Sequence, residues 1–304
     1  MKPDLSIVIP TYQRTSWLLE LLQSLAIQKG SFEVIVVDDG SPEGDHKEKS
    51  VKGGSWSFPL TYIRQDHAGP ATARNRGLTL ASSNIISFLD DDTAVEPNWT
   101  QHIALGYEDS KIAGVAGRTL SYRVETLAER FLDHEQHLVR HQFQSDGSLA
   151  YVCTANSSFL KSVLEQVNGF NCNLPLPAGD DMDLGFRIRK QGYFFRFNPE
   201  AVAKHRHRAT LLAMWNLFLI SGRGAYMCAQ LNRELDLGHV TSPHLFEPGK
   251  VVRVLKDYAK KTSENLKNTQ LRTSDSILFP FLEVLNHFFY QSGRIYERLR
   301  NAFR

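Results

Sequence analysis

The chain has 304 residues, of which 42% are hydrophobic and 22% are charged. This is the composition of a globular protein, and the length suffices for one large domain or for a domain with an appendage. The formal net charge is only +2, and no nucleic-acid partner is expected. The three cysteines are widely spaced, which argues against a disulfide framework and against a thiolate zinc site.

The N-terminus has no stretch long enough for the hydrophobic region of a signal peptide. The longest apolar runs, residues 211–220 and 277–290, are too short or too interrupted to span a bilayer. We therefore expect a cytoplasmic protein.

Strands and helices alternate over the first 90 residues. A strand over residues 5–9 is predicted to end at Pro10, and Thr15 is predicted to cap the helix that follows. Residues 43–57 are polar and glycine-rich and are predicted to form a mobile loop. Further strands are predicted over 34–37, 60–64 and 85–89, and a helix over 69–81.

This alternation predicts an α/β fold with a mainly parallel sheet. Ligands bind beyond the carboxyl ends of the strands in such sheets. Polar residues follow three of the predicted strands in this way: Thr11, the pair Asp38–Asp39, and the run 90–92. We therefore expect a ligand site at this edge of the sheet.

The acidic run at residues 90–92 is the strongest single feature. Three adjacent carboxylates at the end of a buried strand repel one another unless a cation joins them. Asp90 and Asp92 would point to the same side because side chains alternate along a strand. Two oxygen ligands on one side suit Mg²⁺ or Mn²⁺, although a solvated acidic turn would have the same sequence.

Two weaker features lie upstream of this run. Asp39 precedes Gly40, which permits a tight turn, and its carboxylate could accept a hydrogen bond from a nucleobase. Arg74 and Arg76 lie near a predicted helix start, where they could hold phosphate oxygens or simply form a solvated face.

A helix is predicted over residues 180–191, with acidic residues first and basic residues last. This order matches the helix dipole, and it also places Asp181 where a catalytic base could stand. A helix N-terminus and a nearby metal favour an ionised carboxylate, whereas Asp180 and Asp183 oppose it, so we expect Asp181 to be mostly ionised at neutral pH. His205 and His207 follow, and such a pair could supply a third metal ligand.

As an ordered set, these motifs resemble glycosyltransferase family 2 over about residues 5–208. The matching motifs are Val8-Ile9-Pro10-Thr11-Tyr12, Asp38-Asp39-Gly40-Ser41, Ala73-Arg74-Asn75, the Asp-x-Asp of Asp90 and Asp92 followed by Pro97, the acidic pair at 180–181, and Pro199, Ala201 and His205. Two positions depart from the family pattern: Asp180 replaces a usual Glu, and Gln13 replaces a common Asn.

The resemblance implies a GT-A fold and an inverting glycosyltransferase that uses a nucleotide-sugar and a divalent metal, Mn²⁺ or Mg²⁺. It implies Asp181 as the general base with Asp180 beside it, and Asp92, Asp90 and His205 at the metal. The implied nucleotide-sugar-binding residues are Thr11, Tyr12, Arg14, Asp39, Arg74, Asp90 and Asp91. A UDP- or dTDP-sugar is the first expectation for the donor, and a glycan or lipid-linked saccharide for the acceptor in cell-surface polysaccharide synthesis.

Two other functions would account for some of these motifs. A phosphatase of the haloacid dehalogenase type would need its Thr or Val one place further along than Thr93, and an acidic motif one residue longer than that at 179–183. A non-catalytic nucleotide-sugar-binding module would not need Asp90, Asp92 and Asp181 together.

The predicted organisation is a GT-A catalytic domain over 1–209 and a helical C-terminal extension over 210–304. Within the first, residues 1–110 would bind the nucleotide and 111–209 the acceptor. Residues 1–247 carry 24 basic and 28 acidic side chains, whereas 248–304 carry 11 and 5. Apolar residues recur at helical spacing over 277–303 beside several arginines, so this helix could contact an anionic membrane at its inner face, the catalytic domain, or a second subunit in a homodimer.

Overall fold

The structure is a computed structural model of the chain, and it describes residues 2–136, 149–233, 260–267 and 271–303. The chain divides into two compact units. Unit 1 comprises Met1–Tyr122 and Leu138–Arg206, and unit 2 comprises Arg123–His137 and His207–Arg304.

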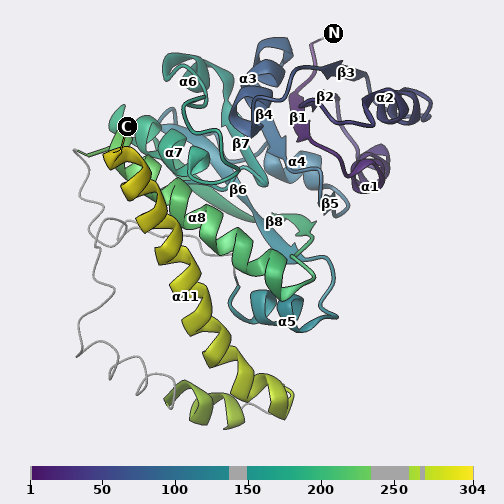
Figure 1. Ribbon diagram of the computed structural model, residues 1–304. Helices are drawn as coiled ribbons and strands as arrows, with labels where there is room; N and C mark the ends of the chain where they lie inside the picture. Colours follow the sequence, from purple (N-terminus) through teal and green to yellow (C-terminus); the bar gives the residue numbers. More distant parts are fainter. Residues whose placement is uncertain (1, 137–148, 234–259, 268–270, 304) are drawn as a thin grey trace. The chain divides into compact units, whose positions relative to one another are not determined.

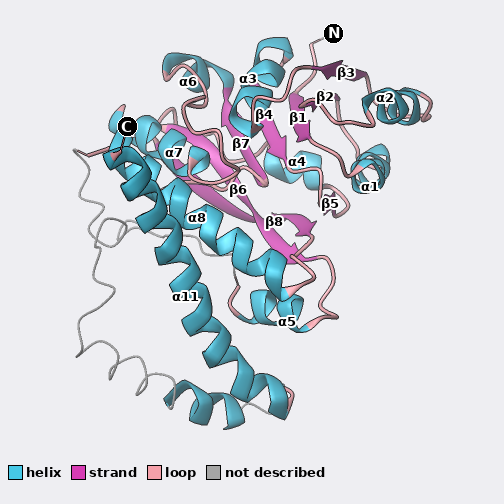
Figure 2. Cartoon of the chain, viewed as in Figure 1, coloured by secondary structure: helices cyan, strands magenta, loops and turns pink. Residues whose placement is uncertain are grey.

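Unit 1 is built on an eight-stranded sheet with the order β3-β2-β1-β4-β7-β6-β8-β5 (Figures 1 and 2). The strands are β1 (Leu5–Thr11), β2 (Phe32–Asp38), β3 (Leu60–Arg64), β4 (Ile85–Leu89), β5 (Thr93–Val95), β6 (Ile112–Ser121), β7 (Asn156–Leu160) and β8 (Phe194–His205). The first four strands are mutually parallel. β7 runs antiparallel to β4 and β6, and β5 runs antiparallel to β8. The predicted α/β fold is confirmed, with a parallel N-terminal half and a mixed remainder.

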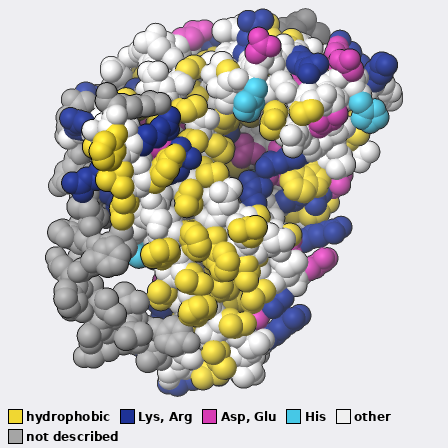
Figure 3. All heavy atoms as spheres, viewed as in Figure 1, with side chains coloured by type: hydrophobic (Ala, Val, Ile, Leu, Met, Phe, Trp, Pro, Cys, Tyr) yellow, Lys and Arg dark blue, Asp and Glu magenta, His cyan; other side chains and the backbone are white. Residues whose placement is uncertain are grey.

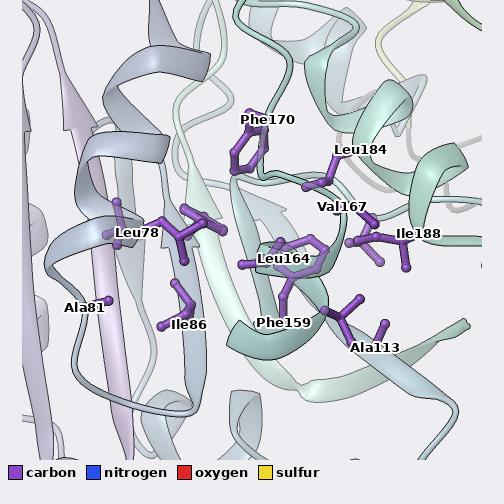
Figure 4. Close-up of a cluster of buried hydrophobic side chains, with 14 of the residues drawn as sticks. Leu78, Ala81, Ile86, Ala113, Phe159, Leu164, Val167, Phe170, Leu184 and Ile188 are labelled. Atoms are coloured by element: carbon purple, nitrogen blue, oxygen red, sulfur yellow. The ribbon is translucent and has the colours of Figure 1, made fainter. Parts of the chain in front are cut away.

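Helices cover both faces of this sheet. They are α1 (Thr15–Ala26), α2 (Gly44–Lys52), α3 (Pro70–Leu80), α4 (Trp99–Ile103), α6 (Lys161–Gln166) and α7 (Asp180–Lys190). Side chains alternate along β1, so Ile7 packs with α1, α2 and α4, whereas Val8 packs with α3, α6 and α7. Figure 4 shows the second cluster, in which Leu78 of α3, Leu164 of α6 and Leu184 of α7 lie around the sheet.

Two predicted boundaries around β1 were wrong. The strand continues through Pro10 to Thr11, because β1 pairs with β4 only as far as Val8 and a missing N–H is tolerated beyond that point. Thr15 is the first residue of α1 rather than its cap. Arg14 holds the capping position in a left-handed conformation, and its carbonyl accepts hydrogen bonds from the backbone of Trp17 and Leu18.

The predicted loop over residues 43–57 was also wrong, because it contains helix α2. Val51 and Lys47 lie on its inner face and are both buried. The ammonium group of Lys47 is 3.6 Å from Asp38 at the end of β2. This tertiary pairing stabilises a helix that the polar local sequence does not reveal.

Unit 2 is helical. Its elements are α5 (Leu127–His134), a helical stretch over 260–267, α8 (Leu211–Leu231) and α11 (Thr273–Ala302). α5 begins with a capping box between Thr126 and Glu129, and Arg130 pairs with Asp275 of α11 at 2.7 Å. The helix predicted near the C-terminus is confirmed as α11. Among the described residues, no helix has both the length and the hydropathy needed to cross a bilayer.

Candidate active site

The acidic run after β4 meets the end of β8. The antiparallel pairing of β5 with β8 sets Thr93 opposite His205 and so brings that imidazole to the carboxylates. His205 Nε2 lies 3.1 Å from Asp92 Oδ1 and 3.8 Å from Asp90 Oδ2. One ligand atom from each of Asp90, Asp92 and His205 falls within a group less than 4.8 Å across. Two carboxylates and an imidazole are a donor set that accepts a divalent cation.

The charges in this group compensate one another. Burial alone would lower the pKa of His205, but Asp92 and Asp90 outweigh it and raise that pKa to about 10. Burial would raise the pKa of Asp90, but His205 and Arg74 lower it below its ordinary value. The carboxylates are therefore arranged to favour a cation beside them.

Asp91 points away from the group formed by its two neighbours. Its Oδ2 accepts a hydrogen bond from Thr11 Oγ1 at 2.8 Å, and Arg14 Nη1 donates to its Oδ1 at 3.0 Å. The same Arg14 nitrogen lies 2.7 Å from Asp92 Oδ2. Burial raises the pKa of Asp91 to about 6 despite Arg14. Thr11, Arg14 and Asp91 thus tie the end of β1 to the acidic run.

The turn after β2 is anchored by Asp39. Its carboxylate accepts hydrogen bonds from the backbone N–H groups of Ala68 and Gly69, each at 2.9 Å. His67 Nδ1 lies 2.9 Å from Asp39 Oδ2, and the His67 ring is tilted against Tyr12 with centroids 4.5 Å apart. His67 therefore contacts both Asp39 and Tyr12. This residue was not identified from the sequence. A base contact by Asp39 stays a prediction.

Lys47, which was also not identified from the sequence, lies between the end of β1 and the turn after β2. Its ammonium group donates to the carbonyl of Gln13 at 2.6 Å and to Ser41 Oγ at 2.7 Å, and it lies 3.3 Å from Thr11 Oγ1. The side chain is fully buried. One lysine therefore joins the loop after β1 to the turn after β2, and no signal in the polar local sequence indicates this role.

Arg74 of α3 links the acidic run to the start of α7. It is buried, and its Nη2 donates to Asp90 Oδ1 at 2.9 Å, while its Nη1 donates to Asp180 Oδ2 at 2.6 Å. Arg76, by contrast, is exposed. The structure thus brings Arg74, Asp90 and Asp180 together. A contact of Arg74 with a donor stays a prediction.

Asp181 occupies the first turn of α7, next to Asp180. The backbone N–H of Met182 donates to its Oδ1 at 2.8 Å. Burial and the charge of Asp180 nevertheless raise its pKa to about 7, outweighing that hydrogen bond and Arg74. Asp181 was expected to be mostly ionised at neutral pH beside a metal. Without the metal, a pKa of about 7 places neutral pH at the midpoint of its titration, because burial outweighs the dipole of this short helix.

Comparison with known proteins supports the resemblance. The sequence profile described as "Glycosyl transferase family 2" matches residues 6–167. The chain is 29% identical over 214 residues to "Pre-mycofactocin glycosyltransferase" of Mycobacterium tuberculosis, covering 68% of this chain and 44% of the relative. It is 28% identical over 241 residues to "Chondroitin synthase" of Escherichia coli, covering 66% and 34%. The chain thus spans less than half the length of either relative.

The fold is shared with a solved structure. That structure is a mannosyltransferase from Pyrobaculum calidifontis in complex with GDP-Man and Mn²⁺, with a TM-score of 0.65 and 16% identity, covering 98% of this chain and 87% of that one. This similarity confirms the predicted GT-A fold. The family match also removes the phosphatase alternative.

Proposed function

Since the chain belongs to glycosyl transferase family 2, we propose that it transfers a sugar from a nucleoside-diphosphate sugar to an acceptor hydroxyl, with inversion at the anomeric carbon. One observation carries the proposal. A group that can hold a metal, Asp90, Asp92 and His205, is joined through Arg74 to a helix start that presents Asp181, a carboxylate with a pKa of about 7.

The residues present fit a divalent cation. Carboxylate oxygens suit both Mg²⁺ and Mn²⁺, and the imidazole of His205 favours Mn²⁺ of the two. Asp90, Asp92 and His205 would hold the ion. When bound, it would supply charge neutralisation for the leaving nucleoside diphosphate.

Asp181 would act as the general base. A base works best when its pKa lies near the working pH, and its rise to about 7 meets that condition. Asp181 would take the proton from the acceptor hydroxyl as that oxygen attacks the anomeric carbon opposite the diphosphate. A single displacement of this kind inverts the configuration and forms no covalent intermediate with the protein.

Neighbouring groups would hold Asp181 and the donor in place. Arg74 pairs with both Asp180 and Asp90, so it connects the first turn of α7 to the proposed metal ligands. Thr11, Tyr12, Arg14, Asp39 and Asp91 would line the nucleotide end of the site. A UDP- or dTDP-sugar remains our first proposal for the donor, and the GDP-Man in the Pyrobaculum structure makes GDP-mannose the next to test.

The acceptor we propose is a glycan or a lipid-linked saccharide, in the synthesis of a cell-surface polysaccharide. The relatives include a chondroitin synthase, which is named for a polysaccharide. The cytoplasm, where nucleotide-sugars are made, would be the site of the reaction.

The test is a panel of nucleotide-sugars incubated with the protein and Mn²⁺, with release of nucleoside diphosphate as the readout. We expect one donor to be turned over, and we expect chelation of the metal to abolish the reaction. Donor binding without any turnover, with or without acceptors, would favour a non-catalytic binding module instead.

A further inference from the structure

The outward side of α11 in unit 2 carries exposed apolar side chains from Ile277 to Leu299, with a gap between Phe288 and Ile295. Exposed hydrophobic side chains recur every three, four or seven residues and so form one stripe on the helix. We define the α11 stripe as Ile277, Phe281, Val284, Phe288, Ile295 and Leu299, all of them exposed. Figure 3 shows hydrophobic side chains gathered over α8 and α11 in the lower half of the view.

The inward side of the same helix carries polar as well as apolar side chains. Asp275, Asn286 and Glu297 are 1–3% exposed, whereas Phe281 and Phe288 are 50% and 51% exposed. The Asn286 amide has no hydrogen-bond partner among the described residues. A helix that folds against water normally buries its apolar side. α11 buries Phe279 and Leu282 against α5 and α8 but leaves the apolar α11 stripe exposed, which is not expected in water. It is the arrangement expected where the medium outside the helix is hydrocarbon.

The packing of α8 on α11 points the same way. A Cβ at Gly222 would clash with the carbonyl of Tyr290, and one at Gly293 with the carbonyl of Leu219. The two helices therefore approach backbone to backbone at two glycines. Close packing through small residues is typical of helices that associate in lipid, where apolar side chains gain nothing by facing inward.

The charges around the stripe favour an anionic partner. Each carboxylate of α11 is already paired with a cation: Asp275 with Arg130, Glu283 with Lys261, and Glu297 with Arg223. Arg298 and Arg300 are exposed beside the stripe near the C-terminal end of α11. A second copy of this chain would bring the same excess of positive charge to the contact.

We propose that the α11 stripe docks on an anionic lipid surface, with its phenylalanines in the boundary between headgroups and acyl chains and its arginines at the headgroups. The helix would lie along the surface rather than cross it. Its 30 residues are about 45 Å long at 1.5 Å per residue, so the stripe offers an extended contact.

The test is co-sedimentation of the full-length protein with vesicles of phosphatidylglycerol and phosphatidylcholine, and with vesicles of phosphatidylcholine alone. We expect binding to the anionic vesicles that weakens as salt rises. Phe281→Ser and Phe288→Ser should each weaken this binding about tenfold, because each removes an aromatic side chain from the contact. Arg298→Glu should weaken it as well, and more at low salt than at high salt.

Ile27→Ser is the matched control, because Ile27 is 69% exposed in unit 1 and lies outside the stripe. It should bind vesicles like the wild type. All variants should still unfold cooperatively, although the phenylalanine variants should unfold at a slightly lower temperature because half of each ring is buried. Lack of binding to anionic vesicles at low salt, or binding that the stripe variants leave unchanged, would overturn the proposal. So would a lipid-free dimer that the phenylalanine substitutions dissociate, because a second copy would then cover the stripe.

Discussion

Two aspartate clusters of unit 1 share Arg74 but differ in how many other cations surround them. In the run 90–92, His205, Arg74 and Arg14 each lie within 3.1 Å of a carboxylate oxygen. In the pair 180–181, Asp180 has Arg74, but Asp181 forms no salt bridge within the described part of the chain. The first cluster is arranged for positive charge and the second leaves one carboxylate ready to bind a proton.

The difference appears in the pKa values. The pKa of Asp90 is held below its ordinary value, whereas that of Asp181 rises to about 7. Carboxylates whose pKa values are pushed apart can serve different functions in one site. Under our proposal the first cluster holds a cation and the second transfers a proton, and each role can be tested separately.

The largest loss of turnover is expected when a proposed metal ligand is substituted. Asp92→Asn keeps the shape of the side chain and removes a charge that a cation needs, so turnover should fall by about 10³-fold or more. Stabilisation of the protein by a nucleoside diphosphate with Mn²⁺, read as a thermal shift, should also disappear. Asp45→Asn is the control, since the Asp45 side chain is 93% exposed, and it should change neither quantity. A metal-dependent thermal shift that survives in Asp92→Asn would remove Asp92 from the metal site.

A second substitution concerns Lys47, the buried cation between the loop after β1 and the turn after β2. Lys47→Met removes the buried ammonium group beside Asp38 and leaves Asp38 with Arg64, 3.9 Å away and partly exposed, as its only cation among the described residues. Removing one partner of a buried ion pair typically costs up to about 3–5 kcal/mol. Chemical denaturation should show this loss of stability. Lys52→Met, at an exposed position of the same helix, should be close to neutral. Equal effects of the two substitutions would show that Lys47 does not hold the loops together.

A smaller effect should appear in the stability of Asp181→Asn without metal. The pKa of Asp181 is about 7 in the folded protein and 3.8 in its ordinary state, so the folded state binds the proton more tightly. As pH rises from about 4 to about 7, the unfolded chain loses its proton first and the folded state loses stability. Asparagine has no such cost. In the presence of chelator at pH 8, the unfolding temperature of the variant should exceed that of the wild type by about 2–4 °C for each kcal/mol of unfolding free energy gained. This difference in unfolding temperature should disappear toward pH 4. A variant less stable than the wild type at pH 8 would contradict the raised pKa.

Much of unit 1 could be predicted because its signals are local. The strands predicted over 5–9, 34–37, 60–64 and 85–89 lie within β1, β2, β3 and β4. The order of acidic and basic residues likewise located α7. The acidic run at the end of β4 stood out because three adjacent carboxylates are costly without a partner.

The rest depends on contacts between distant segments. His205 reaches Asp92 only because β5 pairs with β8, and Lys47 is buried only because α2 packs against the end of β2. The polar sequence of α2 carries no helical stripe that would reveal it. The placement of α5 with α8 and α11 rather than with the sheet depends on contacts such as Arg130 with Asp275. The pKa of Asp181 depends on burial, which a helix-dipole argument does not contain.

The most direct measurement is turnover of Asp181→Asn beside a nucleotide titration of the same protein. The substitution keeps the shape and removes the proton acceptor, so turnover should fall by about 10²–10⁴-fold. Binding of nucleoside diphosphate with Mn²⁺ should be unchanged, since Asp90, Asp92 and His205 are intact. Loss of turnover with intact binding would support the division between the two clusters. Near-normal turnover, or loss of turnover together with nucleotide binding, would contradict it.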